Sequence, residues 1–402
     1  MNRLTKDFFL AILTALLFSA FIYLEDIGIT NKLLNTLFGL GAIALLLYIP
    51  KRALILAGFF IGILWFYWIG YSFKYQGVGY MQPIVTFGFG ILYLIFFAPL
   101  ALSNNALVRA TLLFALSFIE PLGWNWMKVE LLFVNSYLGV YKYQLAIILL
   151  ALSLPWLIKE KKYRFLPLLL LIFAINYGYP KQPQAPLKIK LVETKIPQEI
   201  KWIRSSIYPT VAMIFEEIYK AKQEGYDIVV FPESVFPLFL NETPKLLQEL
   251  SQASKDIAIV AGALMHENAN NYNVTYIFNN GEYSVAKKMI LVPFGEYIPL
   301  PQFAQKFIND TFFQGGSDFV TAKEPTDFTI KGVTFRNAIC YEATCKELYK
   351  GDVKYMIASS NNAWFTPSIE PTLQKLLLEY YGRKNGVTIY HAANMSGTAV
   401  IK

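Results

Sequence analysis

Apolar runs separated by short polar segments make up the chain as far as about residue 180. Seven such runs can be distinguished, over 8–24, 33–50, 53–73, 81–103, 105–124, 143–158 and 165–179. A helix needs about 20 apolar residues to cross a bilayer, so the pattern predicts an α-helical transmembrane bundle of about seven spans over 1–180. The fifth run is the weakest because it contains Arg109 and Glu120, and we interpret Glu120 as an interfacial residue at a helix end.

The charged residues between these runs favour seven spans. Lysine and arginine side chains gather at Arg3 and Lys6, at Lys51 and Arg52, at Arg109, and within 159–164. Basic loops remain in the cytoplasm, and with seven spans all four groups fall on one side of the membrane. The N-terminus is then cytoplasmic, and everything after residue 180 lies outside the cytoplasm.

The pattern changes after 181–186, a polar segment with two prolines that is typical of a linker. Strands are predicted over 187–192, 227–231, 257–263, 273–278, 284–292, 328–340, 353–359, 387–392 and 398–401, and helices over 207–223, 246–254 and 371–385. Such alternation is typical of an α/β domain whose sheets are covered on both faces. A second, catalytic domain is therefore predicted over 187–402.

Composition and charge agree with a membrane domain joined to a domain outside the bilayer. Only 16% of the 402 residues are charged, against roughly 25% in ordinary soluble domains. The net charge of +8 arises almost wholly before residue 181, where 13 basic and 6 acidic residues flank the apolar runs, so no nucleic-acid partner is expected. With two cysteines and two histidines in the chain, we predict no disulfide scaffold, no metal and no cofactor.

Three chemically capable side chains lie at or near the ends of predicted strands. Glu233 follows 227–231, Lys288 lies within 284–292, and Cys340 ends 328–340. Strand ends are where α/β folds place their sites. A thiol nucleophile needs a base to remove its proton and a donor for the oxyanion formed on attack. A carboxylate, an ammonium and a thiol supply these three roles without histidine.

Four short sequences carry a family resemblance. They are IPQEIKW at 196–202, PFGEYIP at 293–299, ICYE at 339–342 and SNNAWF at 360–365. Together with Glu233, Lys288 and Cys340 they resemble the carbon–nitrogen hydrolase (nitrilase) superfamily, and behind a membrane domain they resemble the apolipoprotein N-acyltransferase family. The resemblance covers nearly the whole chain and implies a nitrilase-like α-β-β-α sandwich for 187–402.

The resemblance assigns roles by motif position. Glu233 matches the family's general base, Lys288 its catalytic lysine and Cys340 its nucleophile. Five more residues match positions of the same site, namely the supporting carboxylates Glu296 and Glu342 and the substrate-binding candidates Tyr341, Trp202 and Trp364. For the two tryptophans, an ordinary core or interface position is an equally good interpretation.

The resemblance also implies a ping-pong reaction. Cys340 would take an acyl chain from the sn-1 position of a phospholipid, usually phosphatidylethanolamine, as a thioester. The free α-amine of diacylglyceryl-cysteine at an apolipoprotein N-terminus would then accept it. The protein would be a monomer of the bacterial inner membrane with its catalytic domain on the periplasmic side. Family members usually continue beyond 398–401 with an eighth span, so the catalytic domain is expected to be truncated.

Several residues near these motifs have simpler interpretations. Cys345, His266 and His391 are expected to be structural, and the spacing to PFGE favours Lys288 over Lys287 as the catalytic lysine. A further set of apolar positions is either core or a group of exposed loops that lie in the membrane interface and admit an acyl chain. These positions are 236–240, Leu300, Phe303, Phe312 and Phe313.

Two other functions were weighed against acyl transfer. A membrane-tethered nitrilase or amidase would hydrolyse a C–N bond with the same three residues, but an apolar, bilayer-facing mouth favours transfer because it keeps water from the thioester. A transporter or receptor with a degenerate domain should have lost Glu233, Lys288 or Cys340, and all three are present. Its spans should also carry several ionisable residues.

The loop charges generate a prediction about topology. In intact cells, a cysteine introduced near Lys161 should be protected from a membrane-impermeant thiol reagent, and one near Lys181 should be labelled. Labelling at both positions, or only near Lys161, would contradict the seven-span topology and the extracytoplasmic position of the catalytic domain.

Overall fold

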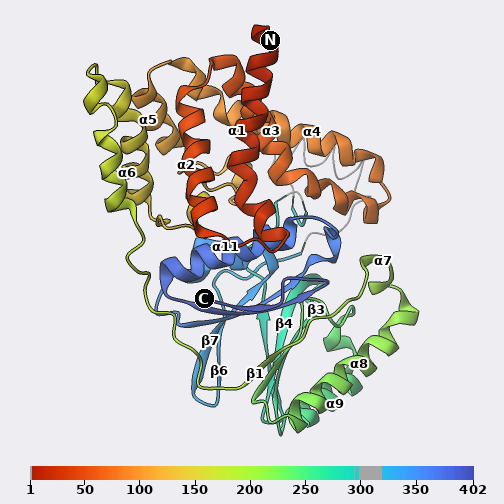
Figure 1. Ribbon diagram of the computed structural model, residues 1–402. Coiled ribbons are helices and arrows are strands. Elements are labelled where there is room, and N and C mark those ends of the chain that lie inside the picture. Colours follow the sequence, from red (N-terminus) through yellow and green to blue (C-terminus); the bar gives the residue numbers. More distant parts are fainter. Residues whose placement is uncertain (1, 294, 298–318) are drawn as a thin grey trace. The chain divides into compact units, whose positions relative to one another are not determined.

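The computed structural model describes residues 2–293, 295–297 and 319–402. The chain divides into two compact units, Met1–Tyr179 and Pro180–Lys402 (Figure 1). The first is helical, and the second combines two sheets with helices. Leu300, Phe303, Phe312 and Phe313, for which an acyl-admitting loop was one interpretation, lie outside the described residues.

Each predicted apolar run of the first unit contains helical structure. The helices are α1 (Arg3–Asp26), α2 (Lys32–Tyr48), α3 (Lys51–Phe66) with η1 (Tyr67–Gln76), η2 (Gly79–Met81) with α4 (Gln82–Phe97) and η3 (Ala98–Leu102), α5 (Ala106–Leu116), α6 (Lys142–Ser153) with η6 (Leu154–Trp156), and η8 (Leu166–Ala174). Within the part of the chain that the structure describes, 3 helical stretches are long and apolar enough to cross a membrane: Arg3–Asp26, Lys51–Tyr75 and Gly79–Leu102. The structure therefore supports a helical membrane domain without confirming seven full-length spans.

The fifth run forms a shorter helix than its apolar residues suggest. α5 ends at Leu116, and Glu120 lies beyond it. Arg109 of α5 is buried, and its Nη1 donates to the carbonyl oxygens of Leu47 and Ile49 at 3.1 and 2.7 Å. These carbonyls belong to the end of α2, where backbone acceptors lack partners within the helix. Arg109 thus serves as a C-terminal cap for α2 in an apolar environment.

Two glycines allow α3 and α4 to pack closely. A Cβ atom on Gly62 would overlap the carbonyl oxygen of Phe89, and one on Gly58 would lie 2.7 Å from the carbonyl oxygen of Tyr93. Small residues four positions apart are a common means by which membrane helices bring their backbones together. The contact between α3 and α4 therefore depends on the absence of side chains at 58 and 62.

Two five-stranded sheets can be traced in the second unit among the residues that the structure describes. The first has the order β1 (Ile189–Leu191), β2 (Ile228–Val230), β3 (Ala258–Glu267), β4 (Asn270–Asn279) and β5 (Glu282–Lys287). The second has the order β10 (Ala399–Ile401), β9 (Thr388–Asn394), β8 (Tyr355–Asn361), β7 (Val333–Ile339) and β6 (Asp327–Ile330). The pairings within β1–β2–β3 and within β7–β8–β9 are parallel, and the pairings β3–β4, β4–β5, β6–β7 and β9–β10 are antiparallel.

Apolar side chains fill the layers of this unit. Val230 and Val260 of the first sheet pack with Phe335 and Ile357 of the second in one buried cluster. The other face of the first sheet is covered by α8 (Arg204–Gln223) and α9 (Pro244–Ala253), whose buried residues include Ile214 and Leu250. On the second sheet, α11 (Glu370–Asn385) contacts β9 and β10 (Figure 1). The order of layers is α-β-β-α.

Two predicted strands differ in the structure. The run 328–340 is a hairpin of β6 and β7, joined at Lys331 and Gly332, whose φ values of +47° and +78° suit a two-residue turn of type I′. The run 284–292 is a strand only as far as Lys287, so that Lys288 is the first residue beyond β5. In the sequence, Gly332 was the residue from which the turn between β6 and β7 could have been predicted.

The close contact of α3 with α4 predicts that Gly62→Ala destabilises the membrane unit. The added methyl group must displace α4 backbone, and overpacking of this kind costs about 1–3 kcal/mol. Gly88→Ala on α4 is the matched control, because its Cβ would have nothing within 4 Å. The midpoint of thermal unfolding in detergent should fall for Gly62→Ala only. Equal midpoints for the two variants would contradict the packing.

Candidate active site

Glu233 lies in the loop after β2, where hydrogen bonds from both sheets hold its carboxylate. Oε1 accepts from the side-chain Nδ2 of Asn273 on β4 at 2.8 Å. Oε2 accepts from the backbone N–H of Asn361, the last residue of β8, at 2.9 Å. The side chain is buried. The carboxylate therefore has a fixed orientation at the junction of the two sheets.

A glycine on β3 leaves room for the Glu233 loop. A Cβ atom on Gly262 would overlap the backbone nitrogen of Ser234 and lie 2.7 Å from the Cα of Glu233. Ser234 itself has a left-handed φ of +48°. Glycine at 262 is thus required for the loop to approach β3.

Lys288 places a buried ammonium between two carboxylates. Its Nζ is 2.8 Å from Glu296 and 3.6 Å from Oε1 of Glu233, and the side chain is 1% exposed. Burial lowers the pKa of Lys288, but Glu296, Glu233 and Cys340 outweigh burial and hold the pKa above the usual range for lysine. Lys288 therefore stays charged at neutral pH. Lys287 instead pairs with Glu267, 2.6 Å away.

Cys340 follows β7 at the start of η11 (Cys340–Thr344), in a left-handed conformation with φ of +57°. This φ is unfavourable for a residue with a side chain, and such strain is often found at functional sites. Burial and Glu233 raise the pKa of the thiol well above its usual value, while Lys288 lowers it. The resting group is a thiol, which needs a base before it can attack.

The two supporting carboxylates have different surroundings. Glu296 pairs with Lys288 and also accepts from the backbone N–H of Val292 at 2.8 Å. Glu342 accepts from the backbone N–H groups of Ile339, Met289 and Ile290, at 2.8, 2.7 and 3.0 Å. Glu342 thereby ties the turn that carries Cys340 to the segment that follows Lys288. Burial raises its pKa to about 7, against opposing effects of Lys288 and these N–H groups.

The three substrate-binding candidates occupy different environments. Tyr341 is buried beside Cys340. Trp202 is 44% exposed and adjoins two exposed residues, Ile200 and Ile203. Trp364 ends η13 (Asn362–Trp364), and its indole nitrogen is 3.3 Å from the side-chain amide of Asn361. Only Trp202 belongs to an exposed apolar surface.

Other sequence interpretations can be compared with the structure. Cys345 is a buried thiol whose sulfur lies 3.7 Å from the carbonyl oxygen of Tyr341. Both ring nitrogens of His391 lie 2.8 Å from hydrogen-bond partners, and burial lowers its pKa to about 4, so it is a neutral structural residue. The segment 236–240 is largely core rather than an open loop, because Phe236 and Leu240 are buried under the helical layer.

Several buried polar residues around the site were not expected from the sequence. Lys201 donates to the carbonyl oxygen of Glu233 at 3.0 Å. Gln374 of α11 has its Nε2 4.0 Å from the sulfur of Cys340. Glu370, at the start of α11, is buried, and its Oε2 lacks a hydrogen-bond partner among the described residues. Lys201 lies in the IPQEIKW motif at 196–202, so this motif could have indicated that Lys201 belongs to the site.

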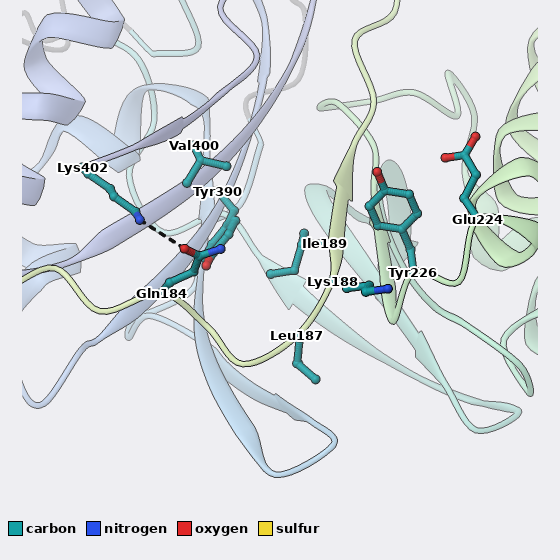
Figure 2. Close-up of a pocket in the computed structure, with 9 residues that line it drawn as sticks. All are labelled: Gln184, Leu187, Lys188, Ile189, Glu224, Tyr226, Tyr390, Val400 and Lys402. Atoms are coloured by element: carbon teal, nitrogen blue, oxygen red, sulfur yellow. Dashed lines mark hydrogen bonds between the residues drawn. The ribbon is translucent and has the colours of Figure 1, made fainter.

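A cavity of about 810 Å³ lies elsewhere in the second unit (Figure 2). It is lined by Gln184, Leu187, Lys188, Ile189, Glu224, Tyr226, Tyr390, Val400 and Lys402. Lys402 Nζ is 3.4 Å from the side-chain oxygen of Gln184, and both residues lie on the side of the cavity away from Glu224 (Figure 2). This lining contains none of the candidate catalytic residues, so the cavity is separate from the site around Cys340.

Comparison with known proteins gives a domain family for each half of the chain. Residues 5–177 match the apolipoprotein N-acyltransferase integral membrane domain, and residues 191–399 match the carbon–nitrogen hydrolase domain. Apolipoprotein N-acyltransferase of Wolinella succinogenes is 45% identical over 398 residues, which is 98% of this chain and 96% of that protein. The Helicobacter hepaticus protein of the same name is 38% identical over 92% of this chain and 94% of its own length.

Among solved structures, a carbon–nitrogen hydrolase superfamily protein from Xanthomonas campestris covers 53% of this chain and 77% of its own, with 13% identity and a TM-score of 0.41. The two domain matches and the near full-length relatives confirm the resemblance found in the sequence. The chain belongs to the apolipoprotein N-acyltransferase family, with an integral membrane domain followed by a carbon–nitrogen hydrolase domain.

Proposed function

We propose that the protein transfers an acyl chain from the sn-1 position of a phospholipid, typically phosphatidylethanolamine, to the α-amine of diacylglyceryl-cysteine on an apolipoprotein. The acyl chain would be carried as a thioester on Cys340. The observation that carries this proposal is the buried cluster of Glu233, Lys288 and Glu296, which acts electrostatically on the Cys340 thiol. Membership of the acyltransferase family favours transfer over the alternative, hydrolysis of a C–N bond.

In the first step, Glu233 takes the proton from Cys340, and the thiolate attacks the ester carbonyl of the phospholipid. The Lys288 ammonium stabilises the resulting oxyanion. When the intermediate collapses, the C–O bond breaks and the lysophospholipid oxygen takes the proton from Glu233. The products are a thioester and a lysophospholipid.

In the second step, the neutral α-amine attacks the thioester carbonyl, and Glu233 accepts a proton from the attacking nitrogen. The oxyanion again faces Lys288, and collapse breaks the C–S bond. The proton on Glu233 returns to the sulfur, so the enzyme regains its resting state. Glu296 acts through Lys288, because its carboxylate keeps the buried ammonium charged.

The location of the reaction is part of the proposal. Seven spans with a cytoplasmic N-terminus place the catalytic domain on the periplasmic side of the inner membrane, as the basic loops favour. The exposed residues Ile200, Trp202 and Ile203 offer an apolar surface that suits lipid. We further propose that the enzyme acts as a monomer.

The assigned roles predict large losses on conservative substitution. Glu233→Gln should keep the fold but remove the base, and Lys288→Met should remove the charge that stabilises the oxyanion. Loss of one preorganised oxyanion donor costs roughly 100- to 1000-fold in rate, and we expect thioester formation to fall by at least about that much. Glu216→Gln, at an exposed position on α8, is the control. Near-normal acylation in either folded site variant would exclude its assigned role.

Decay of the isolated acyl-enzyme separates transfer from hydrolysis. The thioester should persist in buffer, and a diacylglyceryl-cysteine peptide with a free α-amine should discharge it. The same peptide with an acetylated amine should not, because its nitrogen is no longer nucleophilic. Cys340→Ser should form little or no acyl-enzyme, since an alcohol is far less acidic than a thiol. Equal decay with both peptides and with buffer would support a hydrolase instead.

A further inference from the structure

We propose that Glu370 takes a proton from the α-ammonium of the incoming acceptor, so that a neutral amine reaches the thioester on Cys340. This inference rests on the acyl transfer proposed above, because it concerns the second step of that reaction. Glu370 is the first residue of α11 and is 1% exposed.

The proton count of the second step requires a second acceptor. An α-amino group has a pKa of about 7.7–8.0, so at neutral pH the acceptor arrives mainly as an ammonium with three protons. The amide nitrogen of the product keeps one of them. Glu233 carries another to the sulfur of Cys340 as the C–S bond breaks. The remaining proton must leave the nitrogen before the attack, and the two steps above assign no group to it.

The contacts of α11 place Glu370 near Cys340. Gln374 of α11 has its Nε2 4.0 Å from the sulfur of Cys340, and α11 packs against η11, which begins at Cys340. Glu370 and Gln374 are four residues apart, and side chains at this spacing share a helix face with Cβ atoms about 5–6 Å apart. Glu370 is also one of the carboxyl groups that raise the pKa of the Cys340 thiol. Glu370 therefore lies close to the atom that would carry the acyl chain.

Among the residues that the structure describes, Glu370 lacks both a hydrogen-bond partner for Oε2 and a cation to pair with. Glu379 on the same helix, by contrast, lies 3.2 Å from Arg383. Burial and Glu233 hold the pKa of Glu370 well above its usual value, so Glu370 is a neutral acid in the resting enzyme. A buried carboxyl group without a counter-ion is costly to ionise. A cation brought by the substrate would remove much of that cost.

An ammonium that enters beside Glu370 lowers the pKa of the carboxyl group, because an opposite charge favours the ionised form. Glu370 then releases its proton to solvent and pairs with the ammonium. One N–H bond of the ammonium breaks and an O–H bond forms on Oε2, which leaves a neutral amine and a neutral acid. Burial favours this uncharged pair over the ion pair. The net result is the loss of one proton to solvent, with Glu370 unchanged.

The acceptor amine fits this position better than the head group of the phospholipid donor. The acceptor nitrogen must come within bonding distance of the thioester carbon, which is attached to the sulfur of Cys340. The ammonium of phosphatidylethanolamine is separated from the sn-1 ester by the glycerol backbone and the phosphate, and it keeps its protons throughout the reaction. A base near Cys340 therefore serves the acceptor.

The test follows discharge of the isolated acyl-enzyme at about pH 7 by two nucleophiles. Diacylglyceryl-cysteine peptide is mainly an ammonium at this pH, whereas hydroxylamine is a neutral amine and needs no prior loss of a proton. Glu370→Gln keeps the size and neutrality of the side chain. Its discharge by the peptide should fall about tenfold, since about one tenth of an amine is neutral one unit below its pKa. Its discharge by hydroxylamine, and its acylation by phospholipid, should match those of the unmodified protein.

Glu379→Gln is the matched control, because it removes a carboxylate of α11 that already has a cation partner. Both discharge rates should be unchanged in this variant. Unchanged discharge of Glu370→Gln by the peptide, or an equal loss with both nucleophiles, would overturn the proposal. If Glu370→Gln does not fold, Glu370→Met takes its place in the same comparison.

Two further outcomes identify other errors. Slower acylation of Glu370→Gln by phosphatidylethanolamine, with normal acylation by phosphatidylglycerol, would also overturn the proposal, because Glu370 would then bind the head group. Failure of the unmodified protein to form a thioester with any phospholipid would instead contradict the proposed function.

Discussion

The pairing of one buried ammonium with two carboxylates is the interaction on which the catalytic unit depends. Lys288 lies 2.8 Å from Glu296 and 3.6 Å from Glu233, and a charge this deeply buried persists only with such compensation. The same pairing keeps the lysine protonated and therefore able to stabilise an oxyanion. The positions of the residues around it, from the Cys340 turn to the loop after β2, follow from the need to complete this arrangement.

Much of the catalytic unit could be predicted from the sequence, because strands and their ends leave patterns among neighbouring residues. Period-2 and continuous apolar runs located most strands, and strand ends located Glu233 and Cys340. The hairpin of β6 and β7 was predicted to be one strand because both arms are rich in strand-forming residues and only Lys331 and Gly332 separate them. The helix bounds of the membrane unit were harder to predict, because the apolar residues of the fifth run extend past the end of α5 at Leu116.

Buried polar partners were the part of the site that the sequence did not reveal. Asn273, Asn361 and Lys201 are common polar residues with no local pattern, and only tertiary packing brings them to Glu233. Glu342 was predicted to be a carboxylate of the site, but its three backbone donors depend on how the turn after β7 meets the segment after β5. The function of such residues lies in their contacts.

The two hydrogen bonds to Glu233 have a consequence for biosynthesis. One donor, Asn273, belongs to the first sheet, whereas the other, Asn361, is added to the growing chain 88 residues later as part of the second sheet. The carboxylate of Glu233, the proposed base, therefore has only one of these two donors until the second sheet has formed. Cys340 is made before Asn361, so the proposed nucleophile precedes the second donor to Glu233 in synthesis. The complete set of hydrogen bonds to Glu233 thus forms only with the second sheet, which the later part of the chain supplies.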